Sequence, residues 1–175
     1  MGNLKPHKNV HWLLRIFREA RKNKKIASDL VIVGKKDRAY RPEFRELAEL
    51  KTEGAVHYVP YAEGDDLIAL YNAAVALVHP SLYEGFGLTL LEAMACGLPV
   101  IACRAASIPE IAGDAAYLFE PGQPEALLEA LRKMETGSSL RQELILKGHQ
   151  RAVLFSWQQM AQKTFEVYTQ VLNGN

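Results

Sequence analysis

Short runs of β-branched and apolar residues alternate along the chain with segments of helical periodicity. Where strand and helix patterns alternate, successive strands lie parallel in a sheet and the helices cover both of its faces. We therefore predict an α/β fold with a doubly wound parallel sheet. The predicted strands span residues 29–33, 55–59, 75–79 and 99–102, with a weaker strand at 116–119.

Helices are predicted between these strands and after the last of them. The predicted helical segments before and between the strands are 10–24, 42–51 and 63–72. A helix at 124–135 follows the last strand, and further C-terminal helices lie within about 137–173. Ser156 with Gln159 three residues later forms a capping-box pattern, which predicts a helix start at residue 157.

The length and the charge limit the class of protein. A chain of 175 residues with 49% hydrophobic content is expected to form one domain, residues 1–175. The 21 basic residues nearly balance the 20 acidic ones, so we expect no nucleic-acid partner. There is no run of roughly 18 apolar residues and no signal-peptide pattern. We therefore expect a cytoplasmic protein, with Cys96 and Cys103 as reduced thiols.

The N-terminal segment is unusual for this fold. Gly2, Asn3 and Leu4 have the composition of a loop that should follow a strand in a βαβ arrangement. The first strand of a doubly wound sheet is central. We expect that this strand is lacking and that the chain is a truncated domain.

The most informative segment is 79–100, HPSLYEGFGLTLLEAMACGLPV. Here a strand ends, a loop with Gly85 and Gly87 follows, and an apolar helix begins near Leu88. Ligands of parallel sheets bind at the carboxyl ends of strands, glycines allow close approach of the backbone, and the first amides of a helix bind anions. Taken alone, Glu84 before Gly85-Phe86-Gly87 is more often an ordinary strand-to-helix turn.

Glu92 is the one charged residue between Leu88 and Leu98. We predict that this helix is buried on most sides, where an unpaired carboxylate costs several kcal/mol. A pair of ligand hydroxyls, such as those of a ribose, could satisfy the carboxylate. A backbone amide or an arginine could do so equally well.

The segment resembles the signature of the large family of retaining glycosyltransferases that have two Rossmann-like domains (the GT-B type, glycosyl transferases group 1, mannosyltransferase-like). The matching residues are Pro80-Ser81, Glu84-Gly85-Phe86-Gly87-Leu88, Glu92-Ala93-Met94-Ala95, Gly97 and Pro99-Val100. Weaker matches are Gly2-Asn3-Leu4 with Lys8-Asn9, Val31-Ile32-Val33-Gly34 and Pro109-Glu110. The resemblance implies a Rossmann-like, donor-binding C-terminal half of a GT-B fold without its N-terminal acceptor domain.

The resemblance also implies roles for individual residues. Glu84 would bind hydroxyls of the transferred sugar, Glu92 the ribose, and Lys8 the diphosphate, with Glu84 and Lys8 as the catalytic residues. The amides of Gly87, Leu88 and Thr89 would face the diphosphate and sugar, beside Gly85 and Phe86. Gly34 would belong to the donor site, and the loop that begins at Val59 would contact the base.

Asn3 stands where the family usually has an arginine. The difference removes one positive charge from the expected diphosphate site. Lys35 or Lys36 could replace part of that charge.

The implied reaction transfers a glycosyl group from a GDP-, UDP- or ADP-linked sugar to a sugar or lipid-linked acceptor, with retention, without a metal or cofactor. The isolated chain is expected to be inactive. A non-catalytic sugar-nucleotide-binding module and a nucleotide-sugar epimerase remain alternatives. A dinucleotide-dependent oxidoreductase is disfavoured, because Leu90 occupies the position of the third glycine in Gly-x-Gly-x-x-Gly.

Two further features have simpler explanations. His79 is expected to have a capping or core role and is left out of the active site. Residues Arg15, Arg18, Lys22 and Lys25 form a basic helical stripe. A solvated helix face is favoured for this stripe, and peripheral contact with lipid headgroups at the inner face of the membrane is the alternative.

Overall fold

Apolar runs and helical segments form the elements that their patterns predict. The computed structural model describes residues 2, 4–36, 54–137 and 139–174. Its strands are β1 (Leu30–Val33), β2 (Val56–Val59), β3 (Leu77–His79), β4 (Val100–Cys103) and β5 (Ala116–Phe119). All five predicted strands are thus confirmed to within two residues. The predicted helix 42–51 lies outside the described residues.

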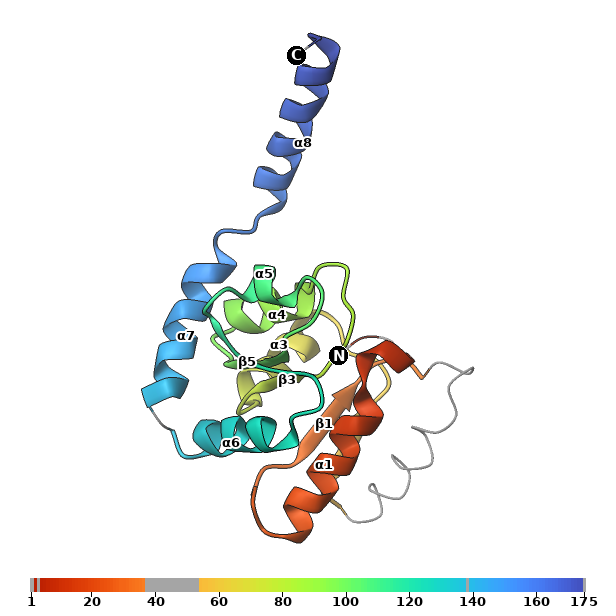
Figure 1. Ribbon diagram of the computed structural model, residues 1–175, viewed down its shortest axis with the longest axis vertical. Helices are drawn as coiled ribbons and strands as arrows, with labels where there is room; N and C mark the ends of the chain where they lie inside the picture. Colours follow the sequence, from red (N-terminus) through yellow and green to blue (C-terminus); the bar gives the residue numbers. More distant parts are fainter. Residues whose placement is uncertain (1, 3, 37–53, 138, 175) are drawn as a thin grey trace.

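The helices follow the predicted order along the chain (Figure 1). A short 3-10 helix, η1, was not predicted, and neither was the five-residue helix α5, which contains Pro109 near its start. The helices are η1 (Pro6–Lys8), α1 (Val10–Lys22), α3 (Gly64–Ala73), α4 (Leu88–Ala95), α5 (Ile108–Ala112), α6 (Pro124–Glu135), α7 (Ser139–Ala152) and α8 (Trp157–Leu172).

The described strands pair in parallel, but they form two sheets where one was expected. β1 pairs with β2 in the register Leu30 to Val56, and β3, β4 and β5 form the other sheet in that order. In the part of the chain that the structure describes, no strand joins β1 to β3. An apolar groove separates their facing edges, at the position where a doubly wound sheet has the central first strand that was expected to be lacking.

This groove encloses a cavity of about 470 Å³. β1 and β3 form its sides, and residues of α1 and α3 contribute to its lining. Lys8 lies at the end near the carboxyl ends of the strands, and Glu135 lines the cavity with Ser28, which precedes β1. The groove, below called the inter-sheet groove, separates a β1-β2 half of the molecule from a β3-β4-β5 half.

Strand β4 lies at the centre of the larger half. All four of its residues are buried, as expected for a parallel strand covered on both faces. Val100 and Ala102 pack in one cluster with residues of α4 and α5, whereas Ile101 and Cys103 pack in another with residues of α6. This alternation follows the two-residue period of a strand and places helices on both faces of the sheet.

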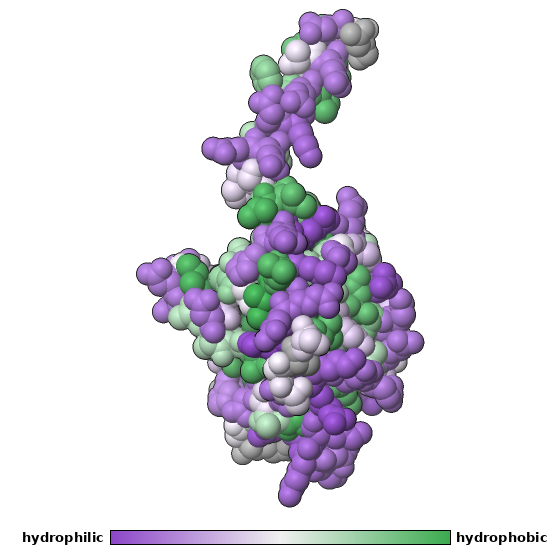
Figure 2. Space-filling model, turned by 90° about the vertical axis from the view of Figure 1, so that its left-hand side faces the viewer, coloured by the Kyte–Doolittle hydropathy of each residue, from purple (hydrophilic) through white to green (hydrophobic). Residues whose placement is uncertain are grey.

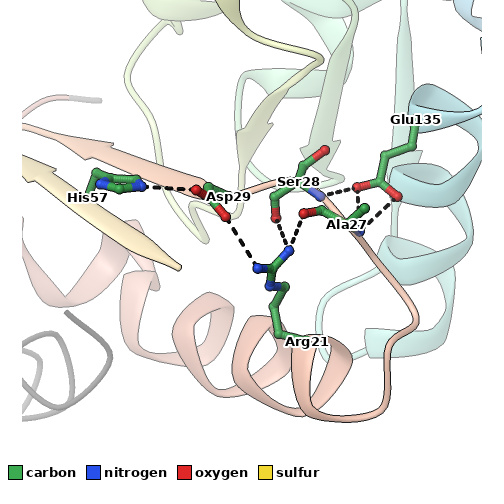
Figure 3. A network of polar contacts seen from close by, with 6 residues as sticks. All are labelled: Arg21, Ala27, Ser28, Asp29, His57 and Glu135. Carbon is green, nitrogen blue, oxygen red and sulfur yellow. Dashed lines mark hydrogen bonds and ion pairs between the residues drawn. The ribbon is translucent and has the colours of Figure 1, made fainter. Parts of the chain in front are cut away.

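A polar network connects the two halves at the end of the groove away from Lys8 (Figure 3). The Glu135 carboxylate of α6 accepts hydrogen bonds from the amides of Ser28 at 2.7 Å and Ala27 at 3.0 Å. Arg21 of α1 lies 3.4 Å from Asp29 and also donates to the Ala27 carbonyl, and His57 of β2 lies 3.1 Å from Asp29. Because α6 packs on β4 and β5, Glu135 ties that layer to the start of β1.

Helix α8 projects away from the rest of the molecule (Figure 1). Its start is as predicted, since the Ser156 hydroxyl accepts a hydrogen bond from the Gln159 amide at 3.1 Å. None of its residues is buried, and Trp157, Phe165 and Tyr168 are each more than 60% exposed. Figure 2 shows hydrophobic surface where the projecting helix joins the body. In the described residues, no helix has the length and hydrophobicity needed to cross a bilayer.

Candidate functional site

The glycine-containing loop connects the carboxyl end of β3 to the start of α4. Gly87, directly before α4, has a φ of 112°, a conformation that L side chains rarely adopt. A Cβ atom there would lie 3.2 Å from Cδ1 of Ile108, so the packing against α5 is also tight. The next amides, of Leu88 and Thr89, open the helix and have no intrahelical acceptor. The geometry therefore favours an anion at this helix start.

Ser107 anchors the loop from the other side. Its hydroxyl lies 3.0 Å from the Glu84 carbonyl and 2.9 Å from the Phe86 carbonyl, and its single hydrogen is shared between these two acceptors. Ser107 was not predicted as a site residue from the sequence. Its one signal is the position before Ile108-Pro109, which resembles a helix N-cap, yet no cap hydrogen bond forms from its side chain.

Lys8 and Glu84, 76 positions apart in the sequence, lie together in the structure. Lys8 Nζ is 2.6 Å from Glu84 Oε1, and the two side chains are only 19% and 12% exposed. Lys8 ends η1 beside the β1-β2 half, whereas Glu84 belongs to the loop after β3. The pair therefore spans the two halves at the carboxyl ends of the strands.

His79, the last residue of β3, also contacts this pair. Its Nε2 lies 3.0 Å from Glu84 Oε1, and its Nδ1 lies 3.5 Å from the Thr89 hydroxyl. The side chain is 3% exposed, in agreement with the expected core position. The contact with Glu84 was not predicted, because no sequence pattern specifies which side chain a buried histidine faces.

The local charges fix the protonation states. Burial alone would raise the pKa of Glu84, but interactions with His79, Lys8 and Ser81 outweigh it and hold that pKa far below its ordinary value. Burial lowers the pKa of His79, and the Glu84 carboxylate opposes this shift only in part. Near neutral pH the site therefore contains an ionised Glu84 and a neutral His79.

Glu92 differs from its predicted environment. The expectation of burial is wrong, because Glu92 is exposed, in line with the exposed Leu88 one turn before it and Ala95 one turn after it on α4. The Tyr71 hydroxyl donates to Glu92 Oε2 at 2.8 Å, and burial together with Glu92 raises the pKa of Tyr71. A ligand is thus not needed to satisfy this carboxylate, although solvent and ligands can reach it.

Gly34 and Val59 lie at the carboxyl ends of β1 and β2. The Gly34 amide donates to the Val59 carbonyl at 2.9 Å, and the Tyr58 hydroxyl donates to the Gly34 carbonyl at 2.8 Å. With a φ of 146°, Gly34 passes so near to Gly2 that a Cβ atom would overlap the Gly2 carbonyl. Only glycine fits at this turn.

The remaining predicted residues are mostly at the surface. Gly85 and Phe86 are exposed, and the Phe86 ring lies edge-on to Phe155 with 5.9 Å between centroids. Lys35 Nζ lies 5.2 Å from the Tyr61 ring, and Lys36 Nζ lies 4.6 Å from the Tyr58 ring. Asn3, whose charge difference these lysines were expected to offset, lies outside the described residues.

Metal-ligating side chains do not gather here. Among residues 2, 4–36, 54–137 and 139–174, no group of three or more His, Cys, Asp or Glu side chains is placed to hold an ion. The positive charge near Glu84 comes from Lys8.

Known proteins are similar to this chain in both sequence and fold. Residues 1–151 match the family model of glycosyl transferases group 1. The chain is 33% identical over 170 residues to the O-antigen chain mannosyltransferase B of Escherichia coli, covering 96% of this chain and 44% of that protein. The chain spans less than half of the length of the first curated relatives it matches.

Two solved structures extend the comparison. A sucrose-phosphate synthase from Thermosynechococcus elongatus superposes with a TM-score of 0.80 and 26% identity, over 99% of this chain and 45% of that one. Anabaena HepE in complex with UDP superposes with a TM-score of 0.79 and 21% identity, over 96% and 48% of the two chains. This chain belongs to the glycosyl transferases group 1 family, and its α/β fold is that of the C-terminal half of GT-B glycosyltransferases.

Proposed function

We propose that residues 1–175 form the donor-binding domain of a retaining glycosyltransferase and bind a nucleoside-diphosphate sugar at the loop between β3 and α4. The observation that carries the proposal is the 2.6 Å contact between Lys8 and Glu84 beside the start of α4. A cation, a carboxylate and free helix amides are the groups that a diphosphate-linked sugar needs. The UDP bound to Anabaena HepE, a protein of the same fold, supports this type of ligand.

In this proposal the donor separates the Lys8–Glu84 pair. The Lys8 ammonium turns to the diphosphate, which also accepts hydrogen bonds from the amides of Leu88 and Thr89. The Glu84 carboxylate then accepts hydrogen bonds from hydroxyls of the sugar. Lys8 exchanges a carboxylate for the diphosphate, and Glu84 exchanges the ammonium for hydroxyl donors, so donor binding leaves neither group without a hydrogen-bonding partner.

The nucleoside lies along the exposed side of α4 toward the β1-β2 half. Glu92 is accessible, and the Tyr71 hydroxyl fixes one of its oxygens, so the other can accept from a ribose hydroxyl. Gly34 and the segment after Val59 contact the base. Tyr61, which is 57% exposed, offers an aromatic surface nearby in the sequence.

Transfer then proceeds with retention at the anomeric carbon. As the bond to the diphosphate breaks, negative charge grows on the leaving group, where Lys8 and the α4 amides stabilise it. The domain supplies this charge from its own residues, so we propose a reaction without a metal. Chain outside residues 1–175 would bind the sugar or lipid-linked acceptor, and the domain alone would not transfer.

Calorimetric titration of the domain with GDP, UDP and ADP, each in EDTA, tests the donor site. We expect saturable binding of one nucleotide, weakened by about 1 to 3 kcal/mol in Glu92→Ala. Glu125→Ala, an exposed carboxylate at the start of α6, is the matched control and should bind normally. A domain that gives a folded circular-dichroism spectrum but binds none of the three would refute the proposal.

Asn3 supports a second candidate, a module that binds the sugar nucleotide without transferring the sugar. It replaces the arginine that the family usually has, and less positive charge at the diphosphate slows its departure. Both candidates predict nucleotide binding. They differ in an assay of glycosyl transfer by a complete two-domain enzyme. The second candidate predicts that no transfer occurs and that the substitution Asn3→Arg restores it.

A further inference from the structure

His79 lies between two groups that face the proposed donor. One ring nitrogen is 3.0 Å from Glu84 Oε1 and the other is 3.5 Å from the Thr89 hydroxyl. The side chain is 97% buried, because only 3% of it is exposed, so bulk water cannot replace either contact. A histidine filling space in the core would not need both of its nitrogens directed at binding residues.

Glu84 Oε1 has two competing partners. Lys8 Nζ approaches it at 2.6 Å and His79 Nε2 at 3.0 Å. His79 Nε2 makes no aligned hydrogen bond despite its 3.0 Å approach to Glu84. Few other buried side-chain nitrogens of the described residues lack an aligned hydrogen bond. Buried polar atoms without an aligned partner are rare and frequently have a functional explanation.

The protonation state suits a donor at Nε2. Burial favours the neutral ring, in which one nitrogen donates and the other accepts. The Thr89 hydroxyl can donate to Nδ1, which places the ring hydrogen on Nε2. That hydrogen is then available to Glu84.

We infer that His79 is a positioning residue for Glu84, and that its Nε2–H becomes the partner of Glu84 Oε1 when the donor diphosphate draws Lys8 away. Glu84 Oε2 then accepts a hydrogen bond from a hydroxyl of the sugar. Through Thr89, the same ring couples the carboxylate to the helix start that faces the diphosphate. The inference rests on the proposed function. It predicts that His79 contributes to the additional affinity that the sugar gives a sugar nucleotide over the nucleotide alone.

The test compares each nucleotide with its sugar-linked form. The 175-residue chain and its variants His79→Leu and His79→Gln are titrated with the pairs GDP and GDP-mannose, UDP and UDP-glucose, and ADP and ADP-glucose. The quantity measured is the ratio of the two Kd values within a pair. Glutamine retains an N–H donor at nearly the position of Nε2, whereas leucine has similar size and no donor.

In the pair that binds, His79→Leu should reduce the affinity gained from the sugar by about tenfold or more, as for a lost hydrogen bond to a charged group. His79→Gln should stay within about threefold of the unsubstituted chain, and the Kd of the nucleotide alone should change little in either variant. If His79→Leu does not fold, His79→Asn replaces it, because its shorter amide reaches toward Thr89 and not Glu84.

Two results would overturn the inference while leaving the proposed function intact. One is an unchanged Kd ratio in His79→Leu or His79→Asn. The other is an equal loss of affinity for nucleotide and sugar nucleotide in all variants, which is the behaviour of a structural residue. If the folded, unsubstituted chain bound no member of any pair, the proposed function itself would fail, and the inference with it.

Discussion

The two halves on either side of the inter-sheet groove differ in how firmly they are packed. In the β3-β4-β5 half every residue of β4 is buried, and α4 packs closely against α7. In the β1-β2 half, Val31 is 46% exposed and β2 has one buried residue. The glycine-containing loop extends from the firmer half, which suits a loop that must hold its backbone amides in fixed positions.

The less firmly packed half contributes one long side chain, Lys8, and one turn, at Gly34. Contacts at both ends of the groove keep them in place. At one end Lys8 meets Glu84 and the Leu82 amide donates to the His7 carbonyl at 2.8 Å. At the other end Glu135 holds the start of β1. The comparison suggests that the firm half determines the shape of the site and the other half adjusts its charge.

Packing substitutions should show the largest difference between the halves. Ile101→Ala removes a fully buried side chain from β4 and should lower the free energy of unfolding by about 2 to 5 kcal/mol. Val31→Ala, on half-exposed β1, should cost less than about 1 kcal/mol. Urea unfolding of both variants measures the two values. Similar losses would show that the halves are equally well packed.

The loop itself gives an intermediate effect. Gly87→Ala forces a Cβ atom into a backbone with φ of 112° and toward Ile108, which should destabilise the domain by about 1 to 3 kcal/mol. Gly85→Ala is the control, since it has no positive φ and no atom within 4 Å of its added Cβ. Thermal unfolding and nucleotide titration should both separate the two variants, and a tolerated Gly87→Ala would mean that the loop is not held rigidly.

A smaller effect than that of Gly87→Ala should come from Glu135, which links the halves. Glu135→Ala leaves the amides of Ala27 and Ser28 without their carboxylate and should cost about 1 to 2 kcal/mol. Hydrogen exchange should rise at β1 and not at β4. Faster exchange at both strands would contradict the separation of the halves.

The same residue should make stability depend on pH. Burial would raise the pKa of Glu135, but hydrogen bonds from Ser28 and Ala27 outweigh it and place the pKa below its ordinary value of 4.5. The folded state thus favours the ionised form, so this stabilisation is present above pH 4.5 and is lost as the pH falls through the lower folded-state pKa. As the pH falls from 6 to 3, the free energy of unfolding, measured by urea unfolding, should therefore decrease less in Glu135→Ala than in the unsubstituted chain.

Local patterns predicted the elements because strands and helices leave a period in the sequence. In β4 an apolar run predicts a buried strand, and after His79 the glycines predict a turn, so in both places neighbouring residues are enough to predict the structure. Strand pairing is not local, but the expected lack of a central first strand agrees with the unpaired facing edges of β1 and β3 in the described residues. Glu92 was misjudged because apolar neighbours on α4, including Leu88 and Ala95, also face outward.

The candidate site was predictable to a similar degree. Lys8, Glu84 and the glycines could be identified from their resemblance to a family, and the structure places Lys8 beside Glu84. The contacts of His79 and Ser107 could not, since a buried histidine and a serine before a helix have many common structural roles. Tertiary packing alone decides what such side chains face.

The inter-sheet groove also has a consequence for how the domain behaves in concentrated solution. In the described residues, β1 and β3 each have a neighbour on one side only, so two rows of backbone amides and carbonyls face the groove without strand partners. Open strand edges of this kind are templates for pairing with another polypeptide. The groove that divides the molecule therefore presents two strand edges at which an extended polypeptide segment would pair.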